Sequence, residues 1–221
     1  MINLQAVFLF KELPSDDLAL LMKSCKELNY KSGETIIKRA TSPHVVVYLV
    51  DGIAKMVEDS DKRMNRIIYI SKSNEFIDVY SIFSNLPYHF SAIALTDCRV
   101  LLFDTSAIKE IAKRNQNFNA ILLRYLSILS IYLLRNTIDL FRKNLKGRIA
   151  YLILYFAHDV FQDLSFTLPL SRNDMAEYCG VSRENISRAL QEFHHEKIIN
   201  LKGKEINILK ENLLEKISDL G

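Results

Sequence analysis

The sequence has little that would indicate an enzyme, a secreted protein or a protein stabilised by disulfides. Its three cysteines, Cys25, Cys98 and Cys179, are odd in number and widely spaced, which excludes a disulfide framework and favours a reducing compartment. It has no glycine-rich phosphate loop, close set of metal ligands or nucleophile motif, so catalysis finds no support. The net charge of +3 does not by itself indicate a nucleic-acid partner.

Targeting signals are also missing from the first 22 residues. Charged residues and a proline interrupt this stretch, so we expect neither a signal peptide nor a membrane span there. Repeats and low-complexity tracts are absent as well. The content of 49% hydrophobic residues can fill the cores of one or two domains, and we expect a cytoplasmic protein.

The most informative feature that is present is a helix-turn-helix pattern near the C-terminus. Ser171 followed by Asp174 is typical of a capping box, which opens a helix. Gly180 then provides the left-handed backbone of a tight turn, with Val181 as an apolar plug, and Ser182 begins the next helix. A pair of ordinary amphipathic helices in some other protein is the alternative interpretation.

The second helix of the pair has an apolar face and a polar face. Its apolar positions follow the helical repeat and comprise Ile186, Ala189, Leu190 and Phe193. Arginine can pair with guanine and glutamate can accept from the cytosine amino group, so we expect Arg183, Glu184 and Arg188 to read bases. Ser187 suits either a base edge or a phosphate. The adjacent His194 and His195 point in different directions and only mark the end of this helix.

A hairpin follows the second helix. The runs 198–201 and 206–209 predict two strands joined by a turn that contains Gly203. Lys202 and Lys204 could reach phosphates from its tip, although a plain solvated turn explains either lysine equally well. The expected DNA-binding residues are Ser171, Arg172, Ser182, Arg183, Glu184, Ser187, Arg188, Lys202 and Lys204.

The N-terminal half of the chain is predicted to be mainly β-structure. After a short helical start around 18–22, it changes to brief β-rich runs, with Gly33 and Gly52 marking turns. Close spacing of such strands predicts a small antiparallel barrel or roll. The runs are 35–37, 45–50, 66–70 and 99–103.

These features together resemble the CRP/FNR family of bacterial transcription regulators, over nearly the whole chain. The resemblance rests on the helix-turn-helix, the hairpin or wing, the segment 147–150, and the motifs Ser182-Arg183-Glu184 and Glu184-x-x-Ser187-Arg188. It implies an α+β fold with an N-terminal antiparallel β-roll (jelly-roll-like) sensor domain over 1–117, a dimerisation helix over 118–143 and a winged helix-turn-helix over 144–221. It also implies palindromic double-stranded DNA with TTG or TGTGA-like half-sites, and RNA polymerase as a partner.

The resemblance also locates a phosphate-binding cassette over 74–83 and 90–92. Where cyclic-AMP-binding members have Gly-Glu, this chain has Asp78-Val79, and Phe90 stands where they have the phosphate-pairing arginine. Only Ser91 remains. A cyclic phosphate beside Asp78 with no arginine would bury an uncompensated charge, which disfavours cyclic AMP. An iron-sulfur cluster is disfavoured because only two cysteines precede the DNA-binding half, although a cluster shared between subunits is not excluded.

The effector stays open between a haem that binds a gas, a small apolar or anionic metabolite, and none at all. Aromatic residues in the altered cassette favour haem, for which His44, His89, Met56, Met64 or Cys98 could supply an axial ligand. Each lone histidine, however, is more often an ordinary surface or packed residue than a haem ligand. The expected effector-pocket residues are Phe76, Asp78, Val79, Tyr80, Phe83, Phe90, Ser91, Leu133 and Leu134.

The segment between the two halves carries an a/d repeat, with the polar exception Asn136. The spacing predicts a coiled-coil dimer, and the alternative is a helix buried in its own chain. A dimer would place two recognition helices about 34–36 Å apart. The family resemblance implies a hinge near 144–147 that links sensing to DNA reading. The rival function is a cyclic-nucleotide-like module whose winged helix docks a protein. The repeat comprises Leu122, Leu126, Leu129, Leu133, Asn136 and Leu140, with a second apolar face of Ile121, Tyr125, Ile128 and Tyr132.

Overall fold

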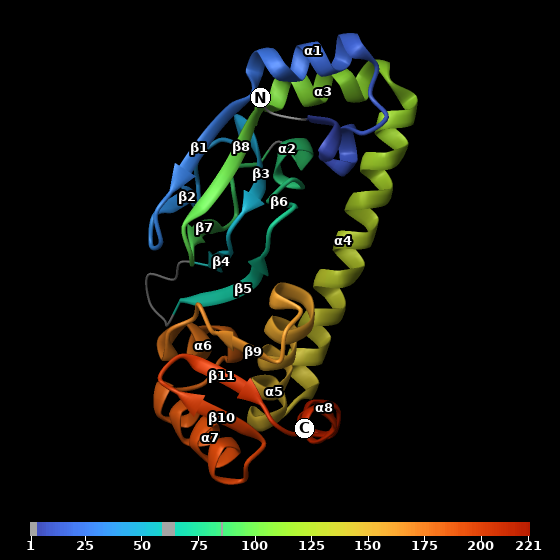
Figure 1. Cartoon of the computed structure of the whole chain (residues 1–221). Coiled ribbons are helices and arrows are strands. Elements are labelled where there is room, and N and C mark those ends of the chain that lie inside the picture. The colour runs from blue at the N-terminus through green and yellow to red at the C-terminus, as the bar shows by residue number, and fades with distance from the viewer. Residues whose placement is uncertain (1–3, 59–64, 85) are drawn as a thin grey trace. The chain divides into compact units, whose positions relative to one another are not determined.

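The computed structural model describes residues 4–58, 65–84 and 86–221 (Figure 1). The chain divides into two compact units, and the division falls between Leu133 and Leu134 inside the long helix α4 (Gln116–Arg142). The fold is of the predicted α+β class. The domain limits at 117 and 143 remain predictions.

The N-terminal unit begins with short helices and continues as strands. Its helices are η1 (Leu4–Ala6), η2 (Phe8–Phe10), α1 (Ser15–Ser24), α2 (Ser81–Ser84), α3 (Thr105–Arg114) and the first part of α4. Its strands are β1 (Lys26–Tyr30), β2 (Thr35–Ile37), β3 (Val45–Asp51), β4 (Ala54–Glu58), β5 (Arg66–Ser71), β6 (Glu75–Ile77), β7 (Ser91–Ala94) and β8 (Cys98–Asp104).

The strands form two four-stranded sheets with the orders β1-β8-β3-β6 and β2-β7-β4-β5. The pairs that the structure describes are antiparallel, with Val47 opposite Leu102 at the centre of the first sheet. One apolar cluster includes Val47, Leu49, Met56 and Val100 from both sheets, so the inward-facing residues of the two sheets meet in one core. The predicted antiparallel roll is confirmed.

A second apolar cluster joins the first sheet to the helices. Phe10 and Phe103 lie edge to face with ring centroids 5.0 Å apart, and Phe118 at the start of α4 is fully buried beside them. Arg114 of α3 donates to Asp17 of α1 at 2.6 Å. The helices therefore pack against one another and cover one face of the sheet β1-β8-β3-β6.

The expected a/d repeat on α4 faces the chain's own cores. Leu122 belongs to the second cluster, while Leu126 and Leu129 pack against it and Leu133 packs against the inter-sheet cluster. Asn136 is 5% exposed within the C-terminal unit. These positions therefore cover part of their own chain, and the expected dimer seam stays a prediction, because a 3-4 spacing describes any one-sided apolar stripe.

Other residues of α4 are left exposed instead. Leu123, Leu134 and Phe141, for example, each lie one position after a residue of the repeat, which is about 100° around the helix. The second apolar face is divided, since Ile121 and Tyr125 pack on the core whereas Ile128 is exposed. The exposed large side chains are Leu123, Ile128, Ile131, Tyr132, Leu134, Ile138 and Phe141.

The C-terminal unit includes the last part of α4 and continues beyond it. The side chain of Asn144 caps α5 by accepting from the backbone N–H of Gly147 at 3.0 Å, so a new helix begins at the expected hinge segment. A three-stranded antiparallel sheet has the order β10-β11-β9. The elements are α5 (Leu145–Tyr155), the π-helical turn η3 (Phe156–Phe161), β9 (Ser165–Thr167), α6 (Arg172–Cys179), α7 (Arg183–His195), β10 (Ile199–Lys202), β11 (Glu205–Ile208) and α8 (Glu211–Leu220).

Candidate nucleic-acid interface

Helix α6 begins with the capping box that the sequence predicts. The hydroxyl of Ser171 accepts from the backbone N–H of Asp174 at 3.1 Å, and the Asp174 carboxylate accepts from the backbone N–H of Ser171 at 2.7 Å. Two otherwise unpaired donors of the helix start are thus satisfied. Gly180 ends the helix with φ of 68°, a conformation that glycine adopts without steric cost.

Helix α7 has the two predicted faces. Ser182 caps it by accepting from the backbone N–H of Asn185 at 3.3 Å. The four apolar residues 186, 189, 190 and 193 are at most 2% exposed, so they hold α7 in the core of the unit. The expected base readers Arg183, Glu184 and Arg188 are all exposed, and Ser187 is half-buried. The hydroxyls of Ser171 and Ser182 are engaged as caps, which assigns them a positioning role.

Glu184 lies in the first turn of α7 and is held in its ionised form. Its pKa is lowered by its own backbone N–H, by the hydroxyl of Ser182 and by the charge of Arg183. An ionised carboxylate is an acceptor only, as contact with the cytosine amino group requires. Glu184 therefore has the charge state that its expected role needs.

The wing is the β10–β11 hairpin, in which Lys202 pairs with Glu205 across the turn. Lys202 and Lys204 are both exposed at its tip, as a phosphate contact requires. A hollow of about 270 Å³ lies between the wing and the starts of α6 and α7. It is lined by Leu170, Ser171, Arg172, Asn173, Arg183, Gly203 and Lys204.

Four expected DNA-binding residues therefore come together around one hollow, and two helix N-termini lie beside them. Backbone N–H groups at a helix start and nearby cations favour an anion such as a DNA phosphate. Asn173 lines the same hollow and is exposed, but the sequence analysis missed it. Its position beside the capping serine, in the first turn of α6, was the available signal.

Arg172 contributes to this hollow as a brace. Its guanidinium donates to the backbone oxygen of Gly203 at 3.0 Å and to the sulfur of Met175 at 3.5 Å. Partial burial lowers its pKa. The residue fixes the wing to the start of α6, so its effect on DNA would come through the position of the wing.

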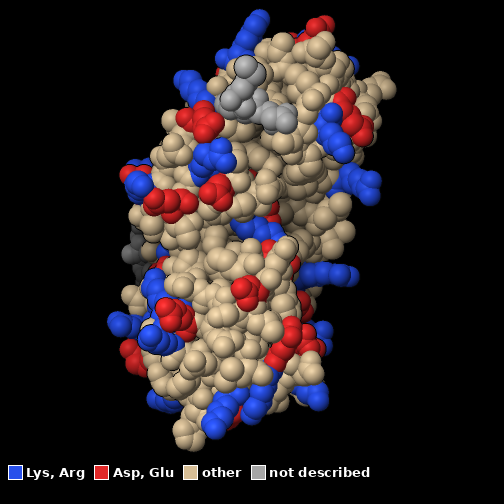
Figure 2. Space-filling model, viewed as in Figure 1, with Lys and Arg blue, Asp and Glu red and all other residues tan. Residues whose placement is uncertain are grey.

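Charge on the surface is distributed in small groups. Figure 2 shows Lys and Arg interspersed with Asp and Glu on the face drawn, consistent with the net charge of +3. The indication of DNA binding comes from the arrangement of the helix pair and wing.

Comparison with known proteins agrees with this arrangement. Residues 147–217 match the Crp-like helix-turn-helix domain, and residues 27–115 match the cyclic nucleotide-binding domain. The chain is 24% identical over 204 residues to the CRP-like cAMP-activated global transcriptional regulator of Mycobacterium tuberculosis, covering 90% of this chain and 91% of that relative. It is 23% identical to the transcriptional activator protein FnrL of Cereibacter sphaeroides, over 93% of this chain and 86% of that relative.

The chain belongs to the CRP/FNR family. It is a transcription regulator with a helix-turn-helix DNA-binding domain, and the relatives named above are regulators, not enzymes. The structure of FixK2 from Bradyrhizobium japonicum has the same fold, with a TM-score of 0.79 and 21% identity over 87% of this chain and 96% of that one. The structure of a CRP/FNR-family regulator from Eubacterium rectale matches with a TM-score of 0.78 and 17% sequence identity, covering 96% of this chain and 97% of that one.

The CRP/FNR cassette holds a buried carboxylate in this chain. Asp78 is 3% exposed and has a left-handed backbone with φ of 52°. The hydroxyl of Ser81 donates to its Oδ1 at 2.7 Å, whereas its Oδ2 has no hydrogen-bond partner among the described residues. Burial raises the pKa of Asp78 to about 6, although the hydroxyls of Ser81 and Tyr80 and the charge of His89 draw it down in part.

The other expected effector residues are placed in different surroundings. Phe76 and Val79 belong to the helix-side cluster, while Tyr80, Phe90 and Leu133 pack against the inter-sheet cluster. Ser91 is buried, and its hydroxyl accepts from the backbone N–H of Arg39 at 3.1 Å. Phe83 and Leu134 are 39% and 62% exposed, so these two side chains do not join the others.

The side chains proposed as metal ligands do not form a prepared site. His44 and His89 are exposed, whereas Met56 and Cys98 are closed into the inter-sheet core, and Met64 lies outside the described residues. The three cysteines are free, and burial raises the pKa of Cys25 to about 11 and that of Cys179 to about 12. Since thiolates are the ligands of iron-sulfur clusters and a cluster normally needs four, the residues present do not fit one.

Among the described residues, α4 alone is long and apolar enough to cross a membrane by length and composition. One such helix is weak support for a span, because core helices of soluble proteins and signal sequences meet the same criterion.

Proposed function

We propose that this CRP/FNR protein acts as a cytoplasmic homodimer that binds a two-fold symmetric DNA site, regulates transcription through RNA polymerase, and responds to an effector other than a cyclic nucleotide. The observation that carries the proposal is the hollow where Arg183, Lys204 and the start of α6 converge next to the exposed polar face of α7. In this arrangement the wing and helix starts would bind phosphates while α7 reads base edges.

The exposed stripe on α4 supports the dimer. Ile131, Leu134, Ile138 and Phe141 recur at spacings of three, four and three residues, and their exposed fractions run from 45% to 72%. Burial of each such side chain stabilises by about 1.5–3 kcal/mol, so a continuous row can hold two copies together. The same row explains why α4 is apolar enough to resemble a membrane span.

The buried carboxylate in the cassette supports an effector of different chemistry. A cyclic phosphate near Asp78 would place like charges together in a site with little solvent, and Phe90 supplies no cation there. Relatives activated by cyclic AMP have the fold in common with this chain, but fold similarity does not transfer the ligand.

The proposal is tested by fluorescence anisotropy with purified, haem-free protein. A labelled duplex with TTG and CAA half-sites in two-fold symmetry is compared with a scrambled duplex. We expect salt-sensitive binding that favours the symmetric duplex, and added cyclic AMP should leave it unchanged.

The rival function, a winged helix that docks a protein, predicts equal and weak binding to both duplexes at every salt concentration. The same result would also follow from a missing effector or from a different half-site. Binding that strengthens with cyclic AMP would overturn the effector part alone.

A further inference from the structure

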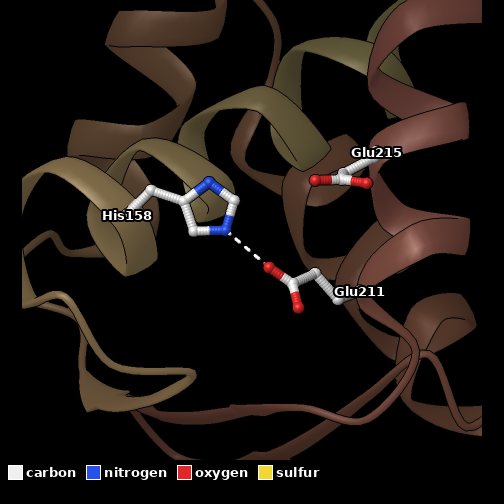
Figure 3. A group of neighbouring side chains, drawn as sticks. All are labelled: His158, Glu211 and Glu215. Atoms are coloured by element: carbon white, nitrogen blue, oxygen red, sulfur yellow. Dashed lines mark hydrogen bonds and ion pairs between the residues drawn. The ribbon is translucent and has the colours of Figure 1, made fainter.

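A histidine and two glutamates lie together on the C-terminal unit, apart from the α7 reading face and the wing. His158 is on the π-helical turn η3, and Glu211 and Glu215 are on α8 (Figure 3). One donor atom from each lies within 4.8 Å of the other two, and the Nε2 of His158 is 2.8 Å from Oε1 of Glu211. We propose that these three side chains form a binding site for a divalent transition-metal ion, with zinc as the best match.

The chemistry of the three donors is that of a zinc site. Imidazole nitrogen and carboxylate oxygen both bind zinc at about 2.0–2.2 Å, and three protein ligands leave a fourth position for water. Magnesium and calcium prefer all-oxygen ligands, so the imidazole selects against them. Two ligand atoms that each lie about 2.0–2.2 Å from a tetrahedral ion are about 3.5 Å apart. The present distance between His158 Nε2 and Glu211 Oε1 is 2.8 Å, so zinc binding would lengthen it by less than 1 Å.

The helix geometry directs both glutamates to the same place. Glu211 and Glu215 are four residues apart and therefore share one face of α8. Figure 3 shows both carboxylates on the side of the helix nearest the imidazole of His158. Two like charges at this spacing repel each other, and an ion between them would remove the repulsion.

The elements that carry the ligands are fixed by packing. Leu214, which lies between the two glutamates in sequence, is fully buried and anchors α8. Phe156, at the start of η3, is fully buried as well, and its ring stacks with that of Phe166 at 6.4 Å. The π-helical turn is a rare conformation that often marks functional positions. The ligands are exposed or half-exposed, so the ion can enter from solvent, and once bound it would join η3 to α8.

The test is a zinc titration of the full-length protein, with no affinity tag, after removal of metals by a chelator. Competition with a chromophoric chelator measures affinity and stoichiometry, and Co²⁺ serves as a spectroscopic probe. We expect one ion per chain, and each of H158Q, E211Q and E215Q should weaken binding by at least about tenfold. The Co²⁺ complex should lack the charge-transfer band of a thiolate ligand.

Two matched variants control for surface binding elsewhere. H195Q removes an exposed imidazole and E196Q an exposed carboxylate near the end of α7, and both should bind zinc as the parent protein does. Zinc should also raise the unfolding temperature of the parent but not of H158Q, since only the former gains the crosslink. Zinc that binds the parent and H158Q equally, or that is lost in H195Q, overturns the proposal. Circular dichroism of each metal-free variant shows whether it is folded.

Discussion

The hydroxyl of Tyr178 on α6 donates a hydrogen bond to the side-chain oxygen of Asn136 on α4, 3.3 Å away, and both side chains are buried. Asn136 is the polar residue that interrupts the apolar repeat of α4, and its partner is the first helix of the helix-turn-helix. The end of the long helix is therefore joined to the DNA-binding fold by a polar contact within one compact unit.

Removal of the Tyr178 hydroxyl should destabilise this unit. Tyr178→Phe leaves a buried acceptor with a lost donor, which should lower the free energy of unfolding by about 1–3 kcal/mol. Urea denaturation of Tyr178→Phe, Asn136→Ala and the double variant measures the coupling. The double variant should lose less than the sum of the single losses, and strictly additive losses would show that the contact contributes nothing.

Arg188 should contribute to sequence discrimination. Arg188→Ala should weaken binding to the symmetric duplex by about 1–3 kcal/mol, or roughly 5- to 150-fold, because a bidentate contact to a base edge is lost. The matched control is Lys197→Ala, which removes the same charge from an exposed position just beyond α7. Competition anisotropy against the scrambled duplex gives the specificity ratio. An equal loss for both duplexes would assign Arg188 to the phosphate backbone.

Lys204 should act through charge alone. It lines the hollow beside the wing, so Lys204→Ala should weaken binding to all sequences alike and reduce the slope of log affinity against log salt by about 1. Binding measured at several salt concentrations gives this slope. Lys216→Ala on the exposed part of α8 is the control and should keep the parent slope.

Leu134 should contribute to dimerisation. It is 62% exposed in the middle of the apolar row, and Leu134→Glu would place charges at the seam of two copies. We expect sedimentation velocity to show monomers at concentrations where the parent is dimeric, together with loss of binding to the symmetric duplex. Leu213→Glu, at a 39% exposed site on α8, controls for removal of an exposed leucine. A dimeric Leu134→Glu variant would contradict the proposed seam.

Within the C-terminal half, the helix-turn-helix and the wing could be predicted from sequence nearly residue by residue, whereas α5, η3, β9 and α8 were not predicted. The determinants of the predicted elements are local: a capping serine, a glycine with positive φ and an apolar stripe each act within a few residues. Capping at Ser171, the turn at Gly180 and the hairpin at 199–208 were therefore all anticipated. The brace from Arg172 to Gly203 was not, because it joins residues 31 positions apart.

For the N-terminal half, the sequence predicted an antiparallel roll but not its full set of strands or their order. Strands β2, β3, β5 and β8 were predicted, and β1, β4, β6 and β7 were missed. β1 is exposed along nearly all its length, and β6 and β7 are only three and four residues long, so these three carry no clear alternation. The surface that the a/d stripe of α4 covers could not be predicted from the sequence either. Its a/d leucines are a real stripe, but spacing cannot tell whether the stripe covers the same chain or another copy.

The His158 site was missed because its ligands come from two elements that are more than 50 residues apart. A lone histidine and an i,i+4 pair of glutamates on a helix are each common in solvent-exposed positions. Only the packing of α8 places the glutamates beside η3, so the cluster has no signature in the sequence.

Asp78 should make the stability of the protein depend on pH. Its pKa in the folded chain is about 6, above its usual value of 3.8, so the folded state binds the proton more tightly than the unfolded state. The free energy of unfolding is then highest at low pH and falls as the pH rises through about 4 to 6, by up to roughly 3 kcal/mol. Burial of the carboxylate away from solvent is the structural origin of this cost.

Asp78→Asn imitates the protonated carboxyl and should remove this dependence. The variant should match the parent near pH 4 and be more stable than it near pH 7, as measured by urea denaturation at each pH. Asp97→Asn is the control of opposite sign, because the exposed Asp97 has its pKa lowered by Lys31. An Asp78→Asn variant that is less stable than the parent at pH 7 would mean that the ionised carboxylate has a cationic partner in solution. In that outcome, Asp78 would be a site that attracts positively charged or hydrogen-bond-donating effectors.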